Sequence, residues 1–314
     1  MRHVLIDTDP GVDDALALIL ALSSSELRVE ALTTVAGNVS LEKASSNALR
    51  LIEYMGAKDV PVAAGAAKPL MRDARSATDI HGESGLGGAD LLEPRWRLDP
   101  RSAVELILDK VEELGGGLTI ITIGPLTNIA LAILTRPAIA EEVEGLVVMG
   151  GAFGLTPFGH GNVTPVAEFN VWHDPEAAKI VFDSGVPITA VGLDVTTSPG
   201  NRLTSTDLRR MESLSTERSR LVADLCRDLI ERFEGLSLHD PLALGVAIDR
   251  SLVETKRFRV EVETMSDLTR GMTVIDRRQR HHVESPKANI DICASLDAER
   301  FKGLFMERVV GGGA

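Results

Sequence analysis

The stretch VLIDTDPGVDDALALIL, residues 4–20, carries the pattern that decides the fold. Residues 4–6 form a short apolar run typical of a buried strand, and residues 15–20 form a longer one typical of a helix. Pro10-Gly11 marks the turn between them. A buried strand that leads directly into a helix is the opening unit of an α/β protein.

Four carboxylates lie in this turn. Strand alternation places Asp7 and Asp9 on one face. Asp13 and Asp14 fall at the start of the helix, where exposed N–H groups favour negative charge. Acidic helix capping explains one of these residues but not all four, which repel one another. Because Ca²⁺ takes roughly six to eight oxygen ligands, the turn predicts a cation site at the mouth of the sheet.

Composition narrows the class of protein. The chain has 314 residues, is 44% hydrophobic and carries a net charge of −13. Such a surface repels phosphate backbones and anionic membranes, so no nucleic-acid or membrane partner is expected. The two cysteines, Cys226 and Cys293, do not make a disulfide framework and fit a cytoplasmic location. No secretory signal is visible, and the longest apolar run, residues 15–22, is too short to cross a bilayer.

Strand and helix patterns alternate along most of the chain. Short apolar strands separated by helices predict an α/β fold with an open, mostly parallel sheet flanked by helices. It is Rossmann-like, but no Gly-x-Gly-x-x-Gly dinucleotide fingerprint follows the first strand. No linker or repeat interrupts the chain, so residues 1–314 are expected to form a single domain. The predicted strands are 4–7, 29–34, 60–63, 118–123, 145–149 and 188–191, and the predicted helices are 13–23, 40–56, 101–114, 126–135, 174–184 and 203–234.

Ligands of such sheets bind beyond the carboxyl ends of the strands. Asp9, Asn38, Gly124 and Met149-Gly150-Gly151 each follow a predicted strand, so these residues are expected to meet at one rim. The polar, glycine-rich stretch 72–90 is interpreted as a lid, with a disordered loop as the alternative.

The last third of the chain has a different pattern. Residues 252–292 are predicted to be β structure, and a helix is predicted for 297–310. The basic patch Arg277-Arg278-Gln279-Arg280-His281-His282 is interpreted as a solvated hairpin tip, because the protein as a whole is acidic.

Several familiar aspartate motifs do not fit. An EF-hand loop needs a glutamate at its twelfth position, which is Leu18 when the count begins at Asp7. The Gly-Lys-Ser/Thr of a phosphate-binding Walker loop is absent from this turn. Phosphatases of the haloacid-dehalogenase type also place Asp-x-Asp after the first strand, but they normally carry threonine or valine where this chain has Gly11.

The run Asp7-Thr8-Asp9-Pro10-Gly11-Val12-Asp13-Asp14-Ala15 resembles the N-terminal signature of the inosine–uridine-preferring nucleoside hydrolases. Further segments resemble motifs of that family in the expected order, and the match covers residues 4–241. They are Ala36-Gly37-Asn38, Ile80-His81-Gly82-Glu83-Ser84-Gly85, Gly124-Pro125-Leu126-Thr127-Asn128, Met149-Gly150-Gly151, Asn162-Val163-Thr164-Pro165-Val166-Ala167-Glu168-Phe169-Asn170, Asp174-Pro175-Glu176-Ala177-Ala178 and His239-Asp240-Pro241.

The resemblance implies hydrolysis of the N-glycosidic bond of a ribonucleoside, which gives ribose and a free purine or pyrimidine base. It also implies one tightly held Ca²⁺ and a homo-oligomer, either a dimer or a tetramer. Departure of the base creates an oxocarbenium-like ribosyl centre, and a water attacks it from the opposite face. A bound cation lowers the pKa of that water, and a carboxylate takes its proton.

By motif position, the resemblance assigns Asp9 as catalytic base and metal ligand, and Asp14 as a bidentate metal ligand. Asp240 supplies a carboxylate from the far end of the chain, and Ile123 supplies its carbonyl oxygen. Asp7 is expected to orient these ligands.

The ribose is expected to be held by carboxylates and amides, which accept hydrogen bonds from sugar hydroxyls and favour positive charge on the ring. The residues assigned to this task are Asp13, Asn38, Asn162, Glu168 and Asn170, with Met149 against the apolar face of the sugar.

Two histidines are candidates for contacts with substrate. His239 resembles the histidine with which some family members protonate the leaving base, and it titrates in the useful range. The alternative for His239 is a ligand-orienting or packing role beside Asp240. His81 is predicted to touch substrate when the lid closes, and the alternative is a solvent-facing loop residue.

The chain departs from the family near the leaving base. Several relatives carry tyrosines in the segment before His-Asp-Pro, whereas the single tyrosine here is Tyr54 and that segment offers Phe233. Base preference is therefore left open. Phe153 or Phe158, in the loop 152–161, is a candidate for stacking on the base, with packing as the alternative.

Two other functions stay open at this point. One is a non-catalytic protein that binds nucleoside or ribose on the same scaffold, against which the intact Asp9, Asp14 and Asp240 argue. The other is a Mg²⁺-dependent phosphohydrolase with Asp7 or Asp9 as nucleophile.

Overall fold

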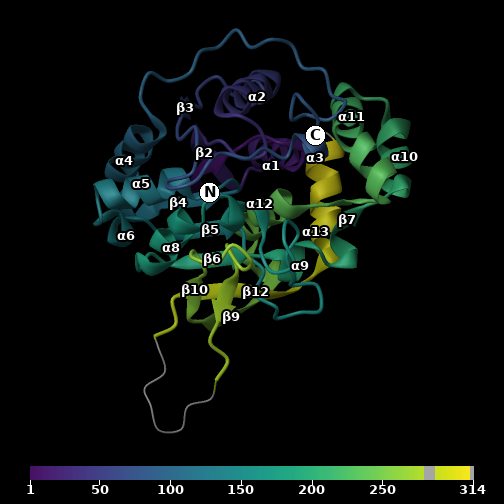
Figure 1. Ribbon diagram of the computed structural model, residues 1–314. Coiled ribbons are helices and arrows are strands. Elements are labelled where there is room, and N and C mark those ends of the chain that lie inside the picture. The colour runs from purple at the N-terminus through teal and green to yellow at the C-terminus, as the bar shows by residue number, and fades with distance from the viewer. Residues whose placement is uncertain (279–286, 312–314) are drawn as a thin grey trace.

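An eight-stranded sheet forms the centre of the computed structural model, which describes residues 1–278 and 287–311 (Figure 1). Its strands are β1 (Arg2–Thr8), β2 (Leu27–Thr34), β3 (Val62–Ala64), β4 (Leu118–Thr122), β5 (Gly145–Met149), β6 (Ile188–Val191), β9 (Val253–Phe258) and β12 (Ile290–Leu296). The strand order is β3-β2-β1-β4-β5-β6-β12-β9. Neighbouring strands from β3 to β12 are parallel, and β9 runs antiparallel to β12. The predicted open, mostly parallel sheet is therefore confirmed.

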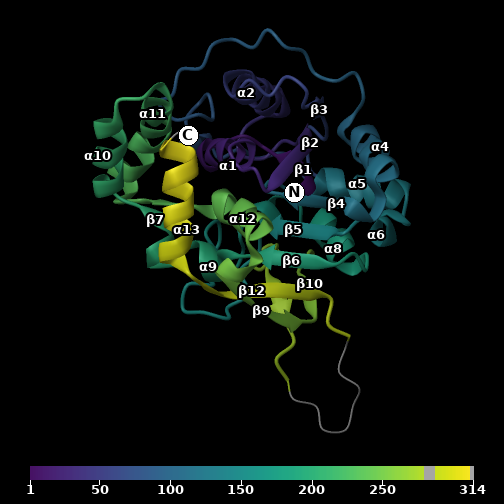
Figure 2. The same cartoon turned by 180° about the vertical axis from the view of Figure 1, so that it is seen from behind.

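Helices cover both faces of this sheet (Figures 1 and 2). On one face lie α1 (Val12–Leu22), α2 (Leu41–Tyr54), α11 (Glu217–Phe233), α12 (His239–Ile248) and α13 (Ala298–Phe305). On the other lie α4 (Ala103–Leu114), α5 (Thr127–Thr135), α6 (Ile139–Glu142) and α8 (Pro175–Asp183). Successive side chains of β1 point to opposite faces of the sheet, so Val4 and Ile6 pack in the core on one face and Leu5 packs in the core on the other.

Short elements complete the fold at the rim and edges. They are α3 (Thr78–His81), α7 (Phe169–His173), α9 (Leu193–Thr196), β7 (Arg202–Leu203), α10 (Ser205–Leu214), β8 (Leu236–Ser237), β10 (Val260–Val262), β11 (Thr273–Ile275), the 3-10 turns 115–117, 199–201 and 250–252, and a π-helical turn at 306–310. β7 pairs with β8, and β10 pairs with β11, in two separate antiparallel ribbons.

The opening turn folds as its sequence predicts. β1 ends at Thr8, and α1 begins at Val12 with Gly11 as its N-cap. The Asp14 carboxylate accepts the N–H of Gly11 at 3.0 Å and so closes the first turn of the helix. Residues 12–21 are all buried, because the sheet lies below α1 and α12 packs beside it.

The helix predicted for residues 203–234 is wrong as a single element, since it is two helices, α10 and α11. Ser215 adopts a left-handed backbone conformation with φ of 54°, which ends α10. Thr216 then caps α11 by accepting the N–H of Ser219 at 3.0 Å. A serine and a threonine in sequence were not a strong enough signal to predict this break.

The last third of the chain belongs to the main sheet. β12 pairs with β6 in parallel and with β9 in antiparallel orientation. Of the predicted basic patch, residues 279–282 lie outside the described residues. Arg277 holds the loop 152–161, because its Nη2 donates to the carbonyl oxygens of Phe153, at 2.8 Å, and Gly154.

Across residues 1–278 and 287–311, no helix is both long enough and apolar enough to span a membrane.

The contact between α12 and α13 gives a test of the packing. A methyl group added at Gly245 would lie 2.6 Å from Cε2 of Phe301. We therefore expect Gly245→Ala to lower the free energy of unfolding by about 1–3 kcal/mol, although alanine favours helices. In the matched control Gly303→Ala, on α13, the added methyl meets no atom of the described residues within 4 Å. The control should gain up to about 1 kcal/mol. Urea unfolding of both variants checks this, and equal stability would contradict the packing argument.

Candidate functional site

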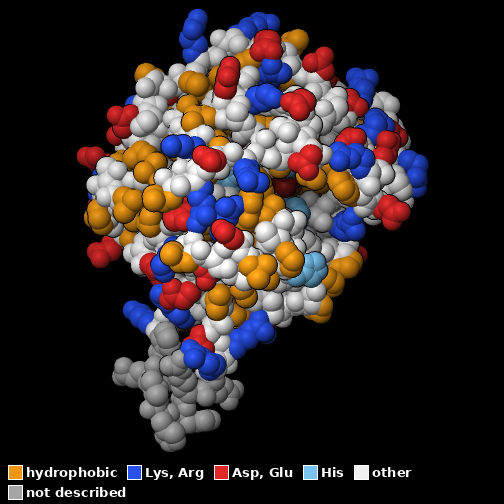
Figure 3. Space-filling model, viewed as in Figure 1, with side chains coloured by type: hydrophobic (Ala, Val, Ile, Leu, Met, Phe, Trp, Pro, Cys, Tyr) orange, Lys and Arg blue, Asp and Glu red, His pale blue; other side chains and the backbone are white. Residues whose placement is uncertain are grey.

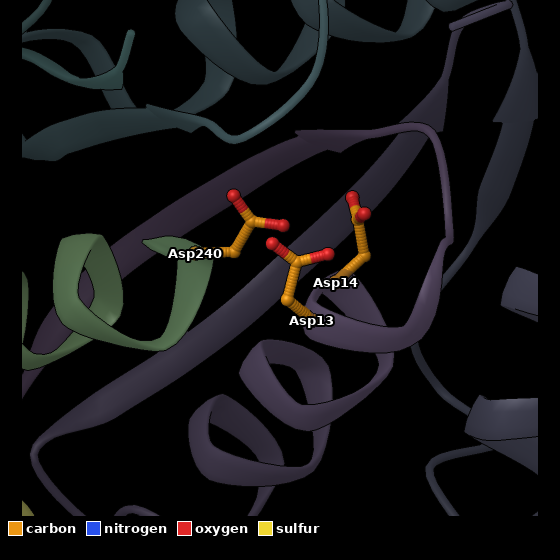
Figure 4. A group of neighbouring side chains, drawn as sticks. All are labelled: Asp13, Asp14 and Asp240. Carbon is orange, nitrogen blue, oxygen red and sulfur yellow. The ribbon is translucent and has the colours of Figure 1, made fainter. Parts of the chain in front are cut away.

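Three carboxylates from opposite ends of the chain meet at the carboxyl edge of the sheet. Asp13 and Asp14 lie in the first turn of α1, and Asp240 lies in the first turn of α12. All three are buried, and oxygen atoms of their carboxylates lie within 4.8 Å of one another. Figure 4 shows the three side chains pointing toward a common centre. The two helices pack side by side, so both N-termini direct N–H groups to the same region.

Asp14 is held by four donors. Its Oδ1 accepts the hydroxyl of Thr8 at 2.6 Å and the N–H of Asp9 at 3.2 Å. Its Oδ2 accepts the side-chain amide of Asn38 at 2.9 Å and the N–H of Gly11 at 3.0 Å. The carboxylate is thus fixed in place as a charged group whose orientation does not depend on a ligand.

Asp9 lies next to Asp14 but outside the group of three. Its Oδ2 accepts the N–H of Asn38 at 2.5 Å, while its Oδ1 is buried and has no hydrogen-bond partner among the described residues. Two glycines make room for this side chain. A methyl group at Gly37 would lie 2.0 Å from Oδ2, and one at Gly124 would lie 2.7 Å from Oδ1.

Asp7 lies deeper, under the rim. Its Oδ1 accepts the hydroxyl of Thr33 at 2.5 Å and the amide of Asn128 at 2.8 Å. Burial raises the pKa of this carboxyl group to about 7, despite both hydrogen bonds. Its partners are Thr33, near the carboxyl end of β2, and Asn128, in the first turn of α5, so Asp7 connects these two elements.

Burial and mutual repulsion disfavour the charged forms of these acids. Burial first, and then Asp14, raises the pKa of Asp9 well above its usual value. Burial first, and then Asp13 and Asp14, does the same to Asp240, and the pKa of Asp13 rises to about 6. The unpartnered Oδ1 atoms of Asp9 and Asp13 add free oxygen donors. This all-oxygen set fits a hard divalent cation such as Ca²⁺, which would supply the missing charge.

A backbone carbonyl lies at the same rim. The Asn170 side-chain amide donates to the carbonyl oxygen of Ile123 at 2.9 Å and to that of Met149 at 3.2 Å. Asn170 therefore ties together the ends of β4 and β5. The Ile123 carbonyl keeps its second lone pair for another partner.

A cavity of about 700 Å³ opens in front of the acids. The space-filling view in Figure 3 shows a hollow with acidic and histidine side chains inside it and basic side chains on either side. Asp9 and Asp14 are not part of its wall. The residues assigned from the sequence that do line it are Asp13, Asn38, His81, Ile123, Met149, Asn162, Glu168, Asn170, His239 and Asp240.

Glu168 and Asn162 reach the cavity from the loop before α7. Glu168 caps this helix by accepting the N–H groups of Asn170, at 2.8 Å, and Val171, at 3.1 Å. It also accepts the N–H of Gly151 at 3.0 Å, which anchors the end of β5. The Oδ1 atom of Asn162 accepts the N–H of Phe169 at 3.0 Å. Both side chains are thus positioned by backbone groups before any substrate binds.

Both histidines lie in the wall, where His81 is buried and His239 is half-buried. His239 Nδ1 lies 2.8 Å from the hydroxyl of Thr196, and burial lowers the pKa of His239. His81, on α3, accepts the N–H of Val12 through Nδ1 at 3.1 Å, and burial lowers its pKa too. The alternative of a solvent-facing His81 is wrong, because it is 8% exposed. The segment 75–81 forms one wall of the cavity.

The aromatic wall differs from the prediction. Phe153 is 3% exposed and packs under Gly151 and Gly192, so its assignment to base stacking is wrong and the packing alternative holds. Phe158 does not line the cavity either. Phe169, Trp172 and Phe233 line it instead. Trp172 was missed, and its position directly after Asn170-Val171 was the available signal.

The missed residues also include two arginines. Arg75 and Arg202 line the cavity, and Arg270 lies 4.0 Å above the ring of Trp172. Nothing in the local sequence around Arg202 indicates this position, because it depends on the pairing of β7 with β8.

Known proteins are similar to this chain in sequence and in fold along nearly its whole length. Residues 4–303 match the profile of a family described as inosine-uridine preferring nucleoside hydrolases. The pyrimidine-specific ribonucleoside hydrolase RihA of Shewanella sp. (strain ANA-3) is 40% identical over 98% of this chain and 95% of its own length. The protein of that name from Citrobacter koseri is 41% identical over 98% and 97%.

Solved structures agree with the sequence match. A purine-preferring ribonucleoside hydrolase from Gardnerella vaginalis is 33% identical, with a TM-score of 0.90 over 99% of this chain and 98% of that chain. A plant nucleoside hydrolase, the PpNRh1 enzyme, is 33% identical, with a TM-score of 0.91 over 98% of this chain and 99% of that chain.

The neighbouring carboxylates of α1 are expected to differ as cation ligands. Asp14 is held by four donors, whereas Asp13 has an unpartnered oxygen at the edge of the cavity. Because a pre-oriented charged ligand loses less entropy on binding, Asp14→Ala should lower Ca²⁺ affinity more than Asp13→Ala. Calcium titration by calorimetry measures both variants, with far-UV circular dichroism as the check on folding. Equal affinities would contradict the assignment.

Proposed function

The chain belongs to the inosine-uridine preferring nucleoside hydrolase family and is a ribonucleoside hydrolase, and we propose that it works with Ca²⁺ and uses Asp9 as its base. The observation that carries this proposal is the meeting of the carboxylates of Asp13, Asp14 and Asp240 beside the cavity. Asp9, with one buried unpartnered oxygen, lies against Asp14.

The cation would be held by the carboxylates of Asp9, Asp14 and Asp240 and by the carbonyl oxygen of Ile123. Asp13 is close enough to these groups to take part. When bound, Ca²⁺ lowers the pKa of a water and balances the negative charge of the carboxylates.

Asp9 would take the proton of the attacking water at Oδ1. This atom is free of hydrogen bonds within the described chain, whereas Oδ2 is occupied by the N–H of Asn38. Gly37 and Gly124 make room for the Asp9 carboxylate in this position, since a methyl group at either residue would clash with it. A carboxylate base fixed in this way contributes both proton transfer and orientation.

The ribose would be held between the acids and the loop before α7. Asp13, Asn38, Asn162, Glu168 and Asn170 all line the cavity and offer oxygen or amide groups to sugar hydroxyls. Their negative and dipolar oxygens also favour the positive charge that develops on the ring as the glycosidic bond breaks. Met149, at the end of β5, offers an apolar surface to the sugar.

The base would leave toward His239, which lies in the wall next to Asp240. Its Nδ1 is engaged by Thr196, so Nε2 is the atom that can face the base. His81 is the second histidine at this wall and stays in the set of substrate contacts.

Pyrimidine ribonucleosides are the substrates that we propose. The relatives at 40–41% identity are named as pyrimidine-specific, whereas the purine-preferring structure is 33% identical. We further propose that residues 1–314 form one domain, that the protein is cytoplasmic, and that it assembles as a homo-oligomer.

The role of Asp9 is tested by Asp9→Asn. The amide keeps the shape of the side chain and an oxygen for the N–H of Asn38, but it cannot take a proton. We expect kcat to fall by about 10²- to 10⁴-fold while nucleoside still binds. Ribose release and calorimetric binding of the nucleoside measure the two effects. Asp59→Asn, at an exposed position, is the matched control. Turnover near the wild-type value in Asp9→Asn would refute the assignment.

Base preference is tested with uridine, cytidine, inosine, guanosine and adenosine, each with Ca²⁺ present. We expect kcat/KM for ribose release to be highest for uridine and cytidine. Chelation of the cation should abolish release, and added Ca²⁺ should restore it. A higher kcat/KM for any purine nucleoside would contradict the pyrimidine assignment. Release from none of the five would contradict the proposed function itself.

A further inference from the structure

Arg202 places a cation in the wall of the cavity, on the side formed by β7, β8 and the end of α11. It lines the cavity together with Phe233, Gly235 and His239. The register of the β7–β8 ribbon pairs Arg202 with Ser237, two residues before His239.

The guanidinium is held in a fixed position. Its Nη2 donates to the carbonyl oxygens of Phe233, at 3.0 Å, and Gly235, at 3.2 Å. A methyl group at Gly235 would lie 3.1 Å from both Nε and Nη2, so the guanidinium packs directly against the backbone there. The carbonyl oxygen of Arg202 accepts a hydrogen bond from Lys302 Nζ at 3.1 Å, which holds β7 in place.

Within residues 1–278 and 287–311, no carboxylate forms an ion pair with this cation. Both hydrogen bonds of its side chain go to backbone carbonyls, and Nε is buried without a partner among the described residues. An arginine side chain keeps its charge at any working pH and offers five donors, most of which remain unused here. Nη1 makes no hydrogen bond to the described residues, so its donors are the ones that an acceptor bound in the cavity would use, whereas Nε is packed against backbone.

Charged groups of both signs line the cavity. Asp13 and Asp240 contribute negative charge from the N-termini of α1 and α12, and Arg202 contributes positive charge from β7. Asp79, Glu168 and Arg75 line the cavity as well. Glycosidic cleavage separates charge in the same sense, because the ribosyl ring becomes positive and the departing base becomes negative. The single tyrosine of the chain, Tyr54, does not line the cavity and cannot protonate the base.

We propose that Arg202 is a catalytic residue that touches the departing base and stabilises the negative charge on it. The C1′–N bond breaks, its electron pair goes to the ring nitrogen, and the charge spreads to the exocyclic oxygen, which the Arg202 guanidinium binds. Water adds its oxygen to C1′ and gives one proton to Asp9. The base anion then takes a proton that His239 Nε2 relays from solvent, and Asp9 returns its proton to solvent, so ribose and neutral base are the products. The inference rests on the proposed function.

Two substrates with different leaving groups test this role. Uridine leaves as a poorly stabilised anion, whereas p-nitrophenyl β-D-ribofuranoside releases a stable p-nitrophenolate that needs no help from the protein. In Arg202→Met, kcat for uridine should fall on the order of 100-fold, as when one preorganised donor to a developing anion is removed. The kcat for the p-nitrophenyl riboside should stay near the wild-type value, which also reports an intact site.

Two further variants complete the experiment. Arg218→Met removes a half-buried arginine of α11 that likewise donates to a backbone carbonyl, that of Arg308, outside the cavity, and it should leave both rates unchanged. Arg202→Lys keeps the charge without the planar donors and should show a smaller loss, again confined to uridine. It carries the test if Arg202→Met does not fold.

The possible results distinguish a failure of the Arg202 assignment from a failure of the proposed function. Equal losses on both substrates in a folded Arg202 variant would show a structural role and overturn the inference, while wild-type activity would still support the proposed function. A wild-type protein that releases ribose from neither substrate would overturn the proposed function and the inference with it.

Discussion

Several carboxylates are buried together where the first strand meets the first helix, and the rest of the site is built around that electrostatic cost. Among the described residues, no lysine or arginine forms an ion pair with Asp9, Asp14 or Asp240. The hydrogen-bond partners of Asp9 and Asp14 are backbone N–H groups, one hydroxyl and one side-chain amide. Unpaired buried charge costs several kcal/mol per ion. Two helix N-termini offset part of this cost, and a divalent cation is the remaining chemical solution.

The same constraint explains why small and polar residues gather around the acids. Gly37 and Gly124 are in contact with the Asp9 carboxylate, and no larger residue would fit at either position. Asn38 serves two acids at once, since its N–H goes to Asp9 and its amide to Asp14. Asn170 plays a similar part for the carbonyls of β4 and β5. A site of this density transmits small shifts directly to its reacting atoms, because close-packed groups have little room to relax.

Charge in the cavity is also arranged by direction. Asp13 and Asp240 come from the starts of α1 and α12, which follow β1 and β8, whereas Arg202 comes from a two-residue strand outside the main sheet. Aromatic and apolar side chains of α7 and α11 line the same cavity. Low effective dielectric strengthens each interaction with a charge that develops there.

Much of the fold and of the candidate site could be predicted from the sequence, because local patterns encode local structure. Alternating apolar runs and helical periods predicted the parallel sheet, and the motif around residues 7–15 predicted both the first turn and its acids. Order along the chain also carried the family resemblance.

Only the tertiary structure decided the contacts that depend on register and packing between distant segments. Phe153 and Trp172 are both aromatic, yet one is core and the other lines the cavity, because the backbone of Gly151 and Gly192 covers Phe153. Arg202 reaches the cavity only because β7 pairs with β8. In the same way, β12 belongs to the main sheet only because it pairs with β6. Such choices follow from burial and pairing across the whole fold, which no local pattern of residues specifies.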